Sequence, residues 1–369
     1  MSEKRRKSED VYRWLRLYVE QNKFSDNLKL PSENFICNKF LVSRTTVRES
    51  LRLLTQEGLI YAVRGSGTYI NQVMVAPLEY GDSNEIKIGA ILQGQDKGAI
   101  HDFLEGIRDE IKGKDIGLYI YYTDNTFANE RYCLQMVMTQ NFSGFIIDGV
   151  KSVIINPNLD CYEKLLQKKK PVIFYNNYYS SLPYPRVTTD NQSSAKLLLG
   201  ELLNKGHKQI VSVFWCDNQQ SLDKFAGYTK MLCSRGLSFQ DDDVYWCMSS
   251  DGVGDSFARN FLKFLRTKTK ATAIVCCNYL VYCEVKKVIE RLNKKIPEQY
   301  SVVCFDYSEK NLEDEGVTCT IHPAYEMGQI SARNLTRMIF NKIPYADRYS
   351  QKIPPKLYEG ISVKNLRDT

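Results

Sequence analysis

Arginine recurs at every fourth position of one short segment, at Arg44, Arg48 and Arg52, and Thr45 and Thr46 follow the first of them. On a helix this spacing places the three guanidinium groups in one row. Like charges four residues apart disfavour an isolated helix by about 0.2–0.5 kcal/mol per pair, so a helix that keeps them indicates an anionic partner. Because an arginine fork matches phosphate and the edge of guanine, the row is a candidate for binding DNA.

Polar side chains in the rest of the chain recur just after short apolar runs. The candidates found in this way are Gln93, Lys151, Asn176, Asp190, Asn278 and Asp306, with the aromatic Tyr175 directly before Asn176. Short carboxylates and amides with few cations suit a neutral polyol, because its hydroxyls both donate and accept hydrogen bonds. Asp and Asn in such places can instead be helix caps or turn formers, and for any single residue both interpretations stay open.

The arginine row needs a scaffold, and the residues before it have the pattern of one. Apolar residues spaced by three and four predict a helix over 8–22. Leu30-Pro31 breaks the chain, and Ser32 has the side chain of an N-cap for a second helix. Ser43 is the expected N-cap of a third helix over 44–57, which carries the arginines.

Two short β runs follow the third helix, at 59–63 and 67–70, and a tip of Arg64-Gly65-Ser66-Gly67 joins them. Three helices followed by such a hairpin predict a winged helix-turn-helix, whose third helix enters the major groove while the wing lies along the backbone or in the minor groove. The alternative is a solvated basic face without a partner. The order of turn, cap, arginine row and wing favours DNA.

This segment resembles the GntR family of bacterial regulators. The matching runs are Leu30-Pro31-Ser32-Glu33, Val42-Ser43-Arg44-Thr45-Thr46-Val47-Arg48-Glu49, Glu57-Gly58-Leu59-Ile60 and Arg64-Gly65-Ser66-Gly67-Thr68-Tyr69. The resemblance implies DNA contacts, and the candidate set is Ser32, Glu33, Ser43, Arg44, Thr45, Thr46, Arg48, Arg64, Gly65, Ser66 and Gly67. Many members have arginine where this chain has Asn34, so we expect one contact to be missing or altered.

The body of the chain has a different pattern. Residues 72–85 lack periodicity and read as a flexible linker between a DNA-binding domain over 1–71 and a body over 86–369. From Ile86 short apolar runs alternate with amphipathic helices, which predicts an α/β fold with parallel sheets covered on both faces. The body is long for one sheet, so we expect two doubly wound lobes with a ligand cleft beyond the carboxyl ends of their strands.

The body resembles the effector domain of the LacI/GalR family, which is itself similar to periplasmic sugar-binding proteins. Matching runs include Phe142-Ser143-Gly144-Phe145-Ile146-Ile147, Gly206-His207-Lys208, Phe225-Ala226-Gly227-Tyr228 and Ile296-Pro297-Glu298-Gln299-Tyr300-Ser301-Val302-Val303. The resemblance implies sugar contacts from Asn176, Lys224, Asn278 and Asp306. Many members have a second polar residue after each of the last two positions, where this chain has Tyr279 and Tyr307.

Composition excludes several other classes. The net charge is +7, and more than half of it falls in the first 80 residues, which hold 13 Lys or Arg against 9 Asp or Glu. No apolar run is long enough to span a membrane and no signal peptide begins the chain, so we expect a cytoplasmic protein. The 11 cysteines are odd in number and lack Cys-x-x-Cys spacing, which favours reduced core residues. No metal-ligand, phosphate-loop or dinucleotide motif indicates a metal, a cofactor or an enzyme.

A GntR-type head on a LacI-type body resembles the arabinose-repressor subfamily of Gram-positive bacteria. It implies a repressor that binds a near-palindromic operator in double-stranded DNA as a homodimer and is released by a small sugar, L-arabinose. The alternatives are a regulator of the same architecture that senses another sugar or a purine, and one that its effector activates.

Overall fold

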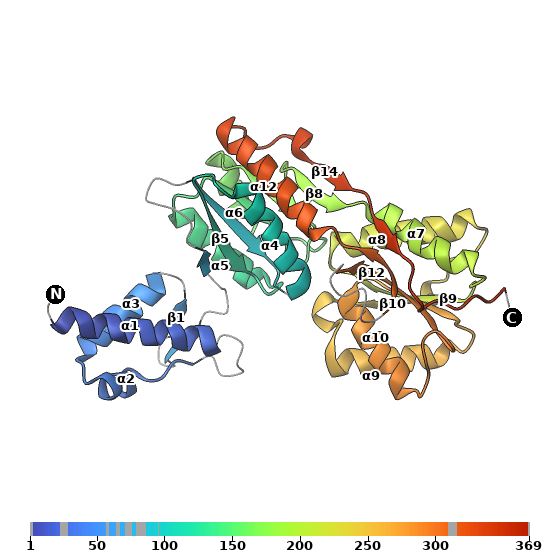
Figure 1. Cartoon of the computed structure of the whole chain (residues 1–369), viewed down its shortest axis with the longest axis horizontal. Coiled ribbons are helices and arrows are strands. Elements are labelled where there is room, and N and C mark those ends of the chain that lie inside the picture. Colours follow the sequence, from blue (N-terminus) through green and yellow to red (C-terminus); the bar gives the residue numbers. More distant parts are fainter. Residues whose placement is uncertain are drawn as a thin grey trace.

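The computed structural model describes residues 3–22, 29–56, 59–63, 67–70, 76–78, 86–94, 96–308 and 316–367. The structure has three parts: a small helical domain with a β-hairpin and two α/β lobes (Figure 1). Among these residues no helix combines the length and the apolar character that a membrane crossing requires.

The first part is a winged helix-turn-helix, as predicted. Its elements are α1 (Glu3–Asn22), α2 (Glu33–Phe40), α3 (Arg44–Gln56), β1 (Ile60–Val63) and β2 (Gly67–Ile70), and the two strands pair antiparallel. Its core is built from the apolar stripes of the three helices, with Val11, Leu15, Ile36, Val47 and Leu54 fully buried. The core therefore holds α3 with its arginine row facing away from the domain.

The second part, called lobe 1, is a seven-stranded sheet in the order β14-β8-β7-β6-β4-β5-β3. Its strands are β3 (Ala76–Leu78), β4 (Ile86–Leu92), β5 (Ile116–Tyr122), β6 (Gly144–Ile147), β7 (Val172–Tyr175), β8 (Arg186–Thr189) and β14 (Gln351–Ile353). Its helices are α4 (Lys97–Ile111), α5 (Phe127–Thr139), α6 (Leu159–Gln167) and α12 (Ala324–Phe340), with a short turn at Asp347–Tyr349. Every pair is parallel except β3 with β5, so the segment expected to be a linker contributes an edge strand.

The third part, lobe 2, is a six-stranded sheet in the order β10-β9-β11-β12-β13-β15. Its strands are β9 (Ile210–Trp215), β10 (Val244–Cys247), β11 (Ala273–Cys276), β12 (Ser301–Tyr307), β13 (Thr318–Ile321) and β15 (Lys356–Tyr358). Its helices are α7 (Asn191–Asn204), α8 (Gln219–Ser234), α9 (Gly254–Thr267) and α10 (Tyr279–Arg291), with short turns at Asp241–Asp243 and Ser249–Asp251. Only β15 runs antiparallel to its neighbour.

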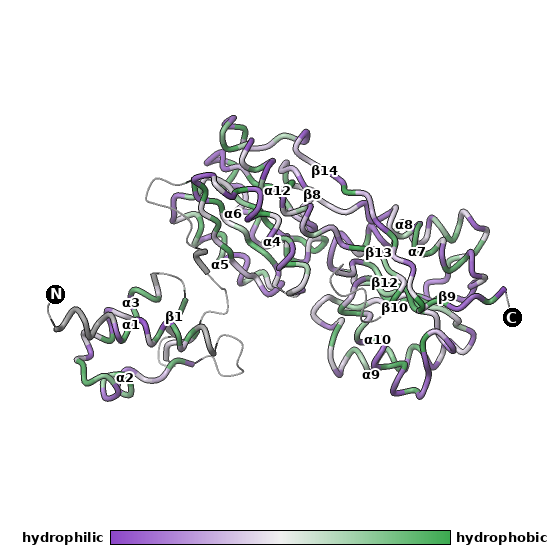
Figure 2. Tube along the Cα trace, viewed as in Figure 1, coloured by the Kyte–Doolittle hydropathy of each residue, from purple (hydrophilic) through white to green (hydrophobic). Residues whose placement is uncertain are grey.

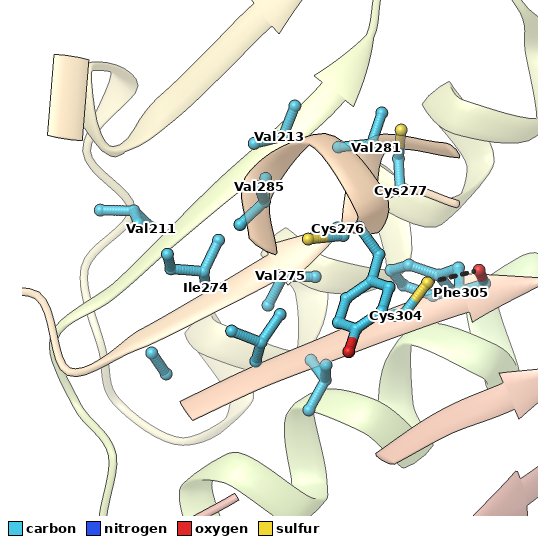
Figure 3. Packing of buried hydrophobic residues seen from close by; sticks show 14 of the residues in the cluster. Val211, Val213, Ile274, Val275, Cys276, Cys277, Val281, Val285, Cys304 and Phe305 are labelled. Carbon is cyan, nitrogen blue, oxygen red and sulfur yellow. Dashed lines mark hydrogen bonds between the residues drawn. The ribbon is translucent and has the colours of Figure 1, made fainter. Parts of the chain in front are cut away.

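Both sheets are buried on both faces, which explains why their strands are nearly continuous apolar runs. In β6 the side chain of Ile146 packs beneath α4 and α12, while Phe145 and Ile147 pack beneath α5 and α6. Figure 2 shows helices that alternate hydrophilic and hydrophobic segments, as helices that cover a sheet do. Figure 3 shows the equivalent core of lobe 2, where Val275 and Cys276 of β11 lie among residues of β9, α10 and β12.

All eleven cysteines are free, as their spacing predicts. Six of them are buried, which fits the expectation of reduced core residues: Cys133, Cys161, Cys276, Cys277, Cys304 and Cys319. Cys216 and Cys233 are exposed, so that expectation is wrong for these two.

The chain crosses between the lobes three times. Asp190 leads from β8 into α7, His322 and Pro323 lead from β13 back to α12, and Pro354 and Pro355 lead from β14 to β15. Two of the crossings touch each other, because the Asp190 amide donates to the Ile353 carbonyl at 2.8 Å. Each lobe is therefore built from separate stretches of sequence, and the crossings form one hinge.

The strand order of the two sheets indicates where a ligand is expected to bind. When the five consecutive parallel strands of each lobe are numbered along the chain, both sheets have the order 2-1-3-4-5. Ligands of such sheets bind beyond the carboxyl ends of the strands, at the point where the order reverses. Here that point lies between β4 and β6 in lobe 1 and between β9 and β11 in lobe 2.

The helix that returns to lobe 1 packs on α4 at unusually short range. Two glycines make this possible, because a Cβ on Gly328 would overlap the Phe103 carbonyl and one on Gly106 would overlap the Tyr325 carbonyl. The first residues of α12 follow the hinge directly, so this contact fixes the hinge against lobe 1.

Replacing Gly328 by alanine is expected to destabilise the chain by about 1–3 kcal/mol, since the new methyl group forces α12 away from α4. Gly200→Ala in the middle of α7 is the matched control, because the atom nearest to its Cβ is Met231 Cε at 3.7 Å and alanine is the better helix former. Thermal unfolding should show a lower melting temperature for Gly328→Ala only. Equal melting temperatures of the two variants would contradict the close approach.

Candidate functional site

The third helix of the first domain presents its polar face to solvent. Arg44, Thr45 and Arg48 are exposed, with Arg48 at 66%. Ser43 caps the helix, as its hydroxyl accepts from the Thr46 amide at 3.3 Å, and Ser32 caps α2 by accepting from the Phe35 amide at 3.2 Å. Two of the predicted DNA contacts are thus also the caps that define where the helices begin.

Two of the arginines are oriented by α2. The Arg48 Nε lies 3.1 Å from a carboxylate oxygen of Glu33, and Arg44 donates to the Asn34 side-chain oxygen at 2.9 Å. Exposed contacts of this kind contribute little stability and are readily exchanged for phosphate. A carboxylate would repel the phosphates of DNA. The geometry therefore indicates that Glu33 positions Arg48 and does not itself contact DNA. Asn34, which stands where many GntR-type sequences have arginine, holds Arg44 in the same way.

The wing is described only in part. Gly67 begins β2 with φ 137°, a backbone conformation that glycine adopts readily, and the Leu30 amide donates to the Thr68 carbonyl at 2.8 Å. The predicted contacts Arg64, Gly65 and Ser66 lie outside the described residues.

A cavity of about 100 Å³ lies between the two lobes, at the carboxyl ends of their strands. Six of the eight predicted effector contacts line it: Gln93, Tyr175, Asn176, Lys224, Asn278 and Asp306. They come from the ends of β4, β7, β11 and β12 and from α8. Further polar or aromatic residues that line the cavity are Asp96, Asp148, Asn177, Trp215, Asn218, Gln220, Ser221 and His322.

A buried ion pair forms one wall of the cavity. Lys224 is 2% exposed, and its ammonium group donates to an Asp306 carboxylate oxygen and, at 3.0 Å, to the Cys277 carbonyl. The charges neutralise each other in a place where an unpaired charge would be strongly unfavourable. Among the described residues that line the cavity, Lys224 is the only lysine or arginine, and it is already paired with Asp306.

His322 lies between the lobes at the hinge. Its Nε2 is 3.1 Å from the Tyr175 hydroxyl in lobe 1, and its Nδ1 is 3.9 Å from an Asp306 carboxylate oxygen in lobe 2. Burial lowers the pKa of His322 below its ordinary value, against the opposing effect of Asp306. The ring is therefore neutral near pH 7, with one nitrogen able to accept a hydrogen bond.

A second carboxyl group faces the cavity from lobe 1. Asp148 accepts from the backbone amide of Asn177 at 3.2 Å and from its side-chain amide at 3.0 Å, and Gln93 donates to the Gly149 carbonyl beside it at 2.7 Å. Burial raises the pKa of Asp148 to about 7, although the bonds from Asn177 oppose the rise. This carboxyl group can therefore both donate and accept hydrogen bonds near neutral pH.

Three buried polar atoms around the cavity have no hydrogen-bond partner among the described residues. They are the Asn176 side-chain oxygen, the Trp215 indole nitrogen and His322 Nδ1. An unpaired buried polar atom costs about 1–3 kcal/mol, so such a group is expected to find a partner in a ligand or water. A ligand with several hydroxyl groups can both donate to the Asn176 oxygen and pair with the His322 nitrogen.

Two predicted effector contacts, Lys151 and Asp190, are not among the described residues that line the cavity. Asp190 caps α7 by accepting from the Ser193 amide at 3.2 Å and its hydroxyl at 2.7 Å. Lys151 stands in a turn with φ 40°, and its ammonium group lies 5.9 Å from the centre of the Phe127 ring. Asn278 shows that capping and lining are compatible, since it caps α10 and still faces the cavity.

The described residues contain one group of three side chains whose ligand atoms could meet at a metal ion: His101, Asp102 and Glu105 of α4. His101 is exposed and pairs with Glu105 at 3.3 Å, which is ordinary for residues four apart on a helix. The contacts of this group are explained without an ion.

Two family models match separate parts of the chain. A model of the bacterial regulatory proteins of the gntR family matches residues 7–70, and a model of periplasmic binding protein-like domains matches residues 199–363. The arabinose metabolism transcriptional repressor of Halalkalibacterium halodurans is 27% identical over 306 residues, which cover 83% of this chain and 82% of that protein. The protein of the same name from Geobacillus stearothermophilus is 28% identical over 319 residues, covering 84% and 85%.

Solved structures show the same fold in the body. The transcription regulator CcpA of Lactococcus lactis superposes with a TM-score of 0.66 at 16% identity, covering 76% of this chain and all of that one. A LacI family transcriptional regulator from Enterococcus faecium with bound ribose superposes with a TM-score of 0.64 at 19% identity, covering 76% and 99%. The chain thus joins a winged helix-turn-helix domain that is similar to the bacterial gntR family to a two-lobed, periplasmic-binding-protein-like domain.

Proposed function

We propose that the chain is a sugar-responsive transcriptional repressor that works in the cytoplasm and is not an enzyme. The observation that carries this proposal is the interlobe cavity, where predicted polar side chains converge and buried polar atoms lack partners. The same chain carries exposed arginines on a helix-turn-helix. A receptor for a small polar molecule is thereby joined to a reader of DNA.

The effector that we propose is L-arabinose. The volume of about 100 Å³ is below the roughly 300–1,000 Å³ of sites for drug-sized ligands, which favours a single small ring. Lys224, the one lysine or arginine among the described lining residues, is already paired with Asp306, which favours a neutral ligand over an anionic one. The names of the two arabinose metabolism repressors support this sugar. Another sugar or a purine, and an effector that promotes DNA binding, are the alternative outcomes of the tests below.

The mechanism follows from the hinge. A homodimer would hold two α3 helices at the spacing of a near-palindromic operator, with base contacts from Arg44, Thr45, Thr46 and Arg48. Sugar in the cavity contacts both lobes and therefore favours the arrangement in which they are closed. The effector can shift the equilibrium only by its difference in affinity for the two arrangements, which is typically about 1–3 kcal/mol.

Replacing Arg44 or Arg48 by alanine is expected to weaken operator binding by about tenfold or more, because a bidentate base contact contributes about 1–3 kcal/mol. Fluorescence anisotropy of a labelled operator at fixed salt measures the change. Arg259→Ala is the control, since Arg259 is exposed on α9 in lobe 2 and its loss changes the net charge by the same amount. Operator affinities that fall equally in all three variants would show that the arginines act only through total charge.

Replacing Asp306 by asparagine is expected to abolish the effector response while operator binding persists. Asparagine tolerates the positive φ of 54° at this position, so the backbone is retained. The change leaves Lys224 buried without its partner and should lower the melting temperature. A second variant, Lys224→Met with Asp306→Asn, removes both charges and should recover stability.

Operator release by L-arabinose, measured by anisotropy, should be lost in both variants and kept in the unmodified protein. Release from either variant at the unmodified sugar concentration would show that the cavity is not the effector site. No release of the unmodified protein by L-arabinose or any other pentose or hexose would remove the sugar from the proposal.

A further inference from the structure

Among the described residues, three hydrogen bonds cross between the lobes outside the hinge. One runs from the Ser308 hydroxyl to the Asp102 carboxylate at 3.4 Å, and the other two lie farther from the hinge. The Asn125 side-chain amide donates to the Ser249 hydroxyl at 2.6 Å, and the Gln219 backbone amide donates to the Ser152 hydroxyl at 2.8 Å. Asn125 and Ser152 belong to lobe 1, and Ser249 and Gln219 belong to lobe 2. The side chains of Asn125, Ser152 and Ser249 are at least nine-tenths buried.

The bond from Asn125 to Ser249 is anchored by a buried carboxylate. Asp217 is fully buried and accepts from both the backbone amide of Ser249, at 3.1 Å, and its hydroxyl, at 2.5 Å. The Ser249 hydroxyl proton is thus directed to Asp217, which leaves its oxygen free to accept from Asn125. On the other side, the Asn125 oxygen accepts from the Lys151 amide at 3.3 Å, which fixes the orientation of the donor.

The position of this bond in the two sheets gives it leverage. Asn125 follows β5 and Ser249 follows β10, and the crossings of the hinge lie at β8 with β14 and at β13 with β15. Four strand spacings separate β5 from β8, and four separate β10 from β13. At about 4.8 Å per spacing the bond lies roughly 19 Å from the hinge, so an opening of about 10° would part its atoms by about 3 Å and break it.

The second interlobe hydrogen bond, from Gln219 to Ser152, is linked to residues that line the cavity. The Ser152 hydroxyl that accepts from Gln219 lies 3.4 Å from the Asn177 side-chain oxygen, and Asn177 in turn donates to Asp148. Asn177 and Asp148 both line the cavity. A change at the far edge of the lobes is therefore linked to the residues that face the effector.

From these contacts we propose that Asn125, Ser249 and Asp217 form a latch that holds the lobes closed. None of the three lines the cavity, so the latch sets how often the closed arrangement is populated rather than which molecule binds. Effector affinity depends on that population, because the apparent dissociation constant is the intrinsic one divided by the closed fraction. The last step rests on the proposed function of the cavity, whereas the latch itself does not.

The decisive variant is Asn125→Asp. Aspartate has the shape of asparagine, retains the oxygen that accepts from the Lys151 amide and tolerates the φ of 54° at this position. It replaces the donor with a carboxylate that faces the Ser249 oxygen and buried Asp217, so the lobes should part. Ser249→Ala is the second variant, which removes the acceptor and adds no charge. Asn141→Asp is the control, because Asn141 is an exposed residue of the same lobe and the same chemical change is made there.

The experiment is hydrogen exchange of the full-length protein without effector, followed by mass spectrometry at pH 8. In both latch variants the peptide that contains the Gln219 amide should exchange at least about fivefold faster, which corresponds to the loss of one hydrogen bond, while peptides from β6 and β11 keep their protection. Small-angle scattering should show a larger radius of gyration. Unchanged exchange at Gln219 in Asn125→Asp and Ser249→Ala overturns the latch, as does equal acceleration in Asn141→Asp.

Calorimetric titration with L-arabinose tests the consequence for the effector. Both latch variants should bind it about fivefold more weakly, and the control should bind it as the unmodified protein does. If the unmodified protein does not bind L-arabinose, the proposed effector is wrong, and hydrogen exchange still decides the latch. If the variants bind as tightly as the unmodified protein although their lobes have opened, the proposed link between the latch and the effector is wrong.

Discussion

The three crossings of the chain between the lobes are the constraint on which the rest of the body depends. They join the two sheets at one edge, so the carboxyl ends of both sets of parallel strands face each other. Polar groups that would be solvated in a single sheet are thereby buried in pairs, as Lys224 with Asp306 and Tyr175 with His322 show. Groups that find no partner are left for a ligand that both lobes contact.

Much of this fold can be predicted from the sequence because local pattern and tertiary structure agree. A strand buried on both faces is an apolar run, and amphipathic helices such as α6 (Leu159–Gln167) alternate with these runs from Ile86 onward. The strands that pattern does not reveal are short or polar. β13 reads Thr-Cys-Thr-Ile, and β14 and β15 have three residues each. They exist because a neighbouring strand pairs with them, which is a tertiary effect.

The site shows the same division. A polar residue within two positions of a strand's end faces the cavity when the chain continues within its lobe, as at Gln93, Asn278 and Asp148. Asp190 also follows a strand directly, but there the chain leaves for the other lobe and the carboxylate caps α7. Lys151 comes three residues after Asp148, where the turn that follows β6 has already carried the chain past the cavity. His322 follows β13, a strand that the sequence pattern does not reveal. The sequence therefore offered no strand end from which to predict that His322 lines the cavity.

The discontinuity of lobe 1 has a consequence for synthesis. The helix α12 and the strand β14 belong to this lobe, yet they are translated after nearly all of lobe 2. The winged helix-turn-helix domain can fold as soon as it leaves the ribosome. Lobe 1 stays incomplete, with one face of its sheet uncovered, until α12 has been translated. A nascent or prematurely terminated chain would therefore carry a folded winged helix-turn-helix domain without a complete two-lobed body. Its exposed sheet would make it a substrate for chaperones and proteases.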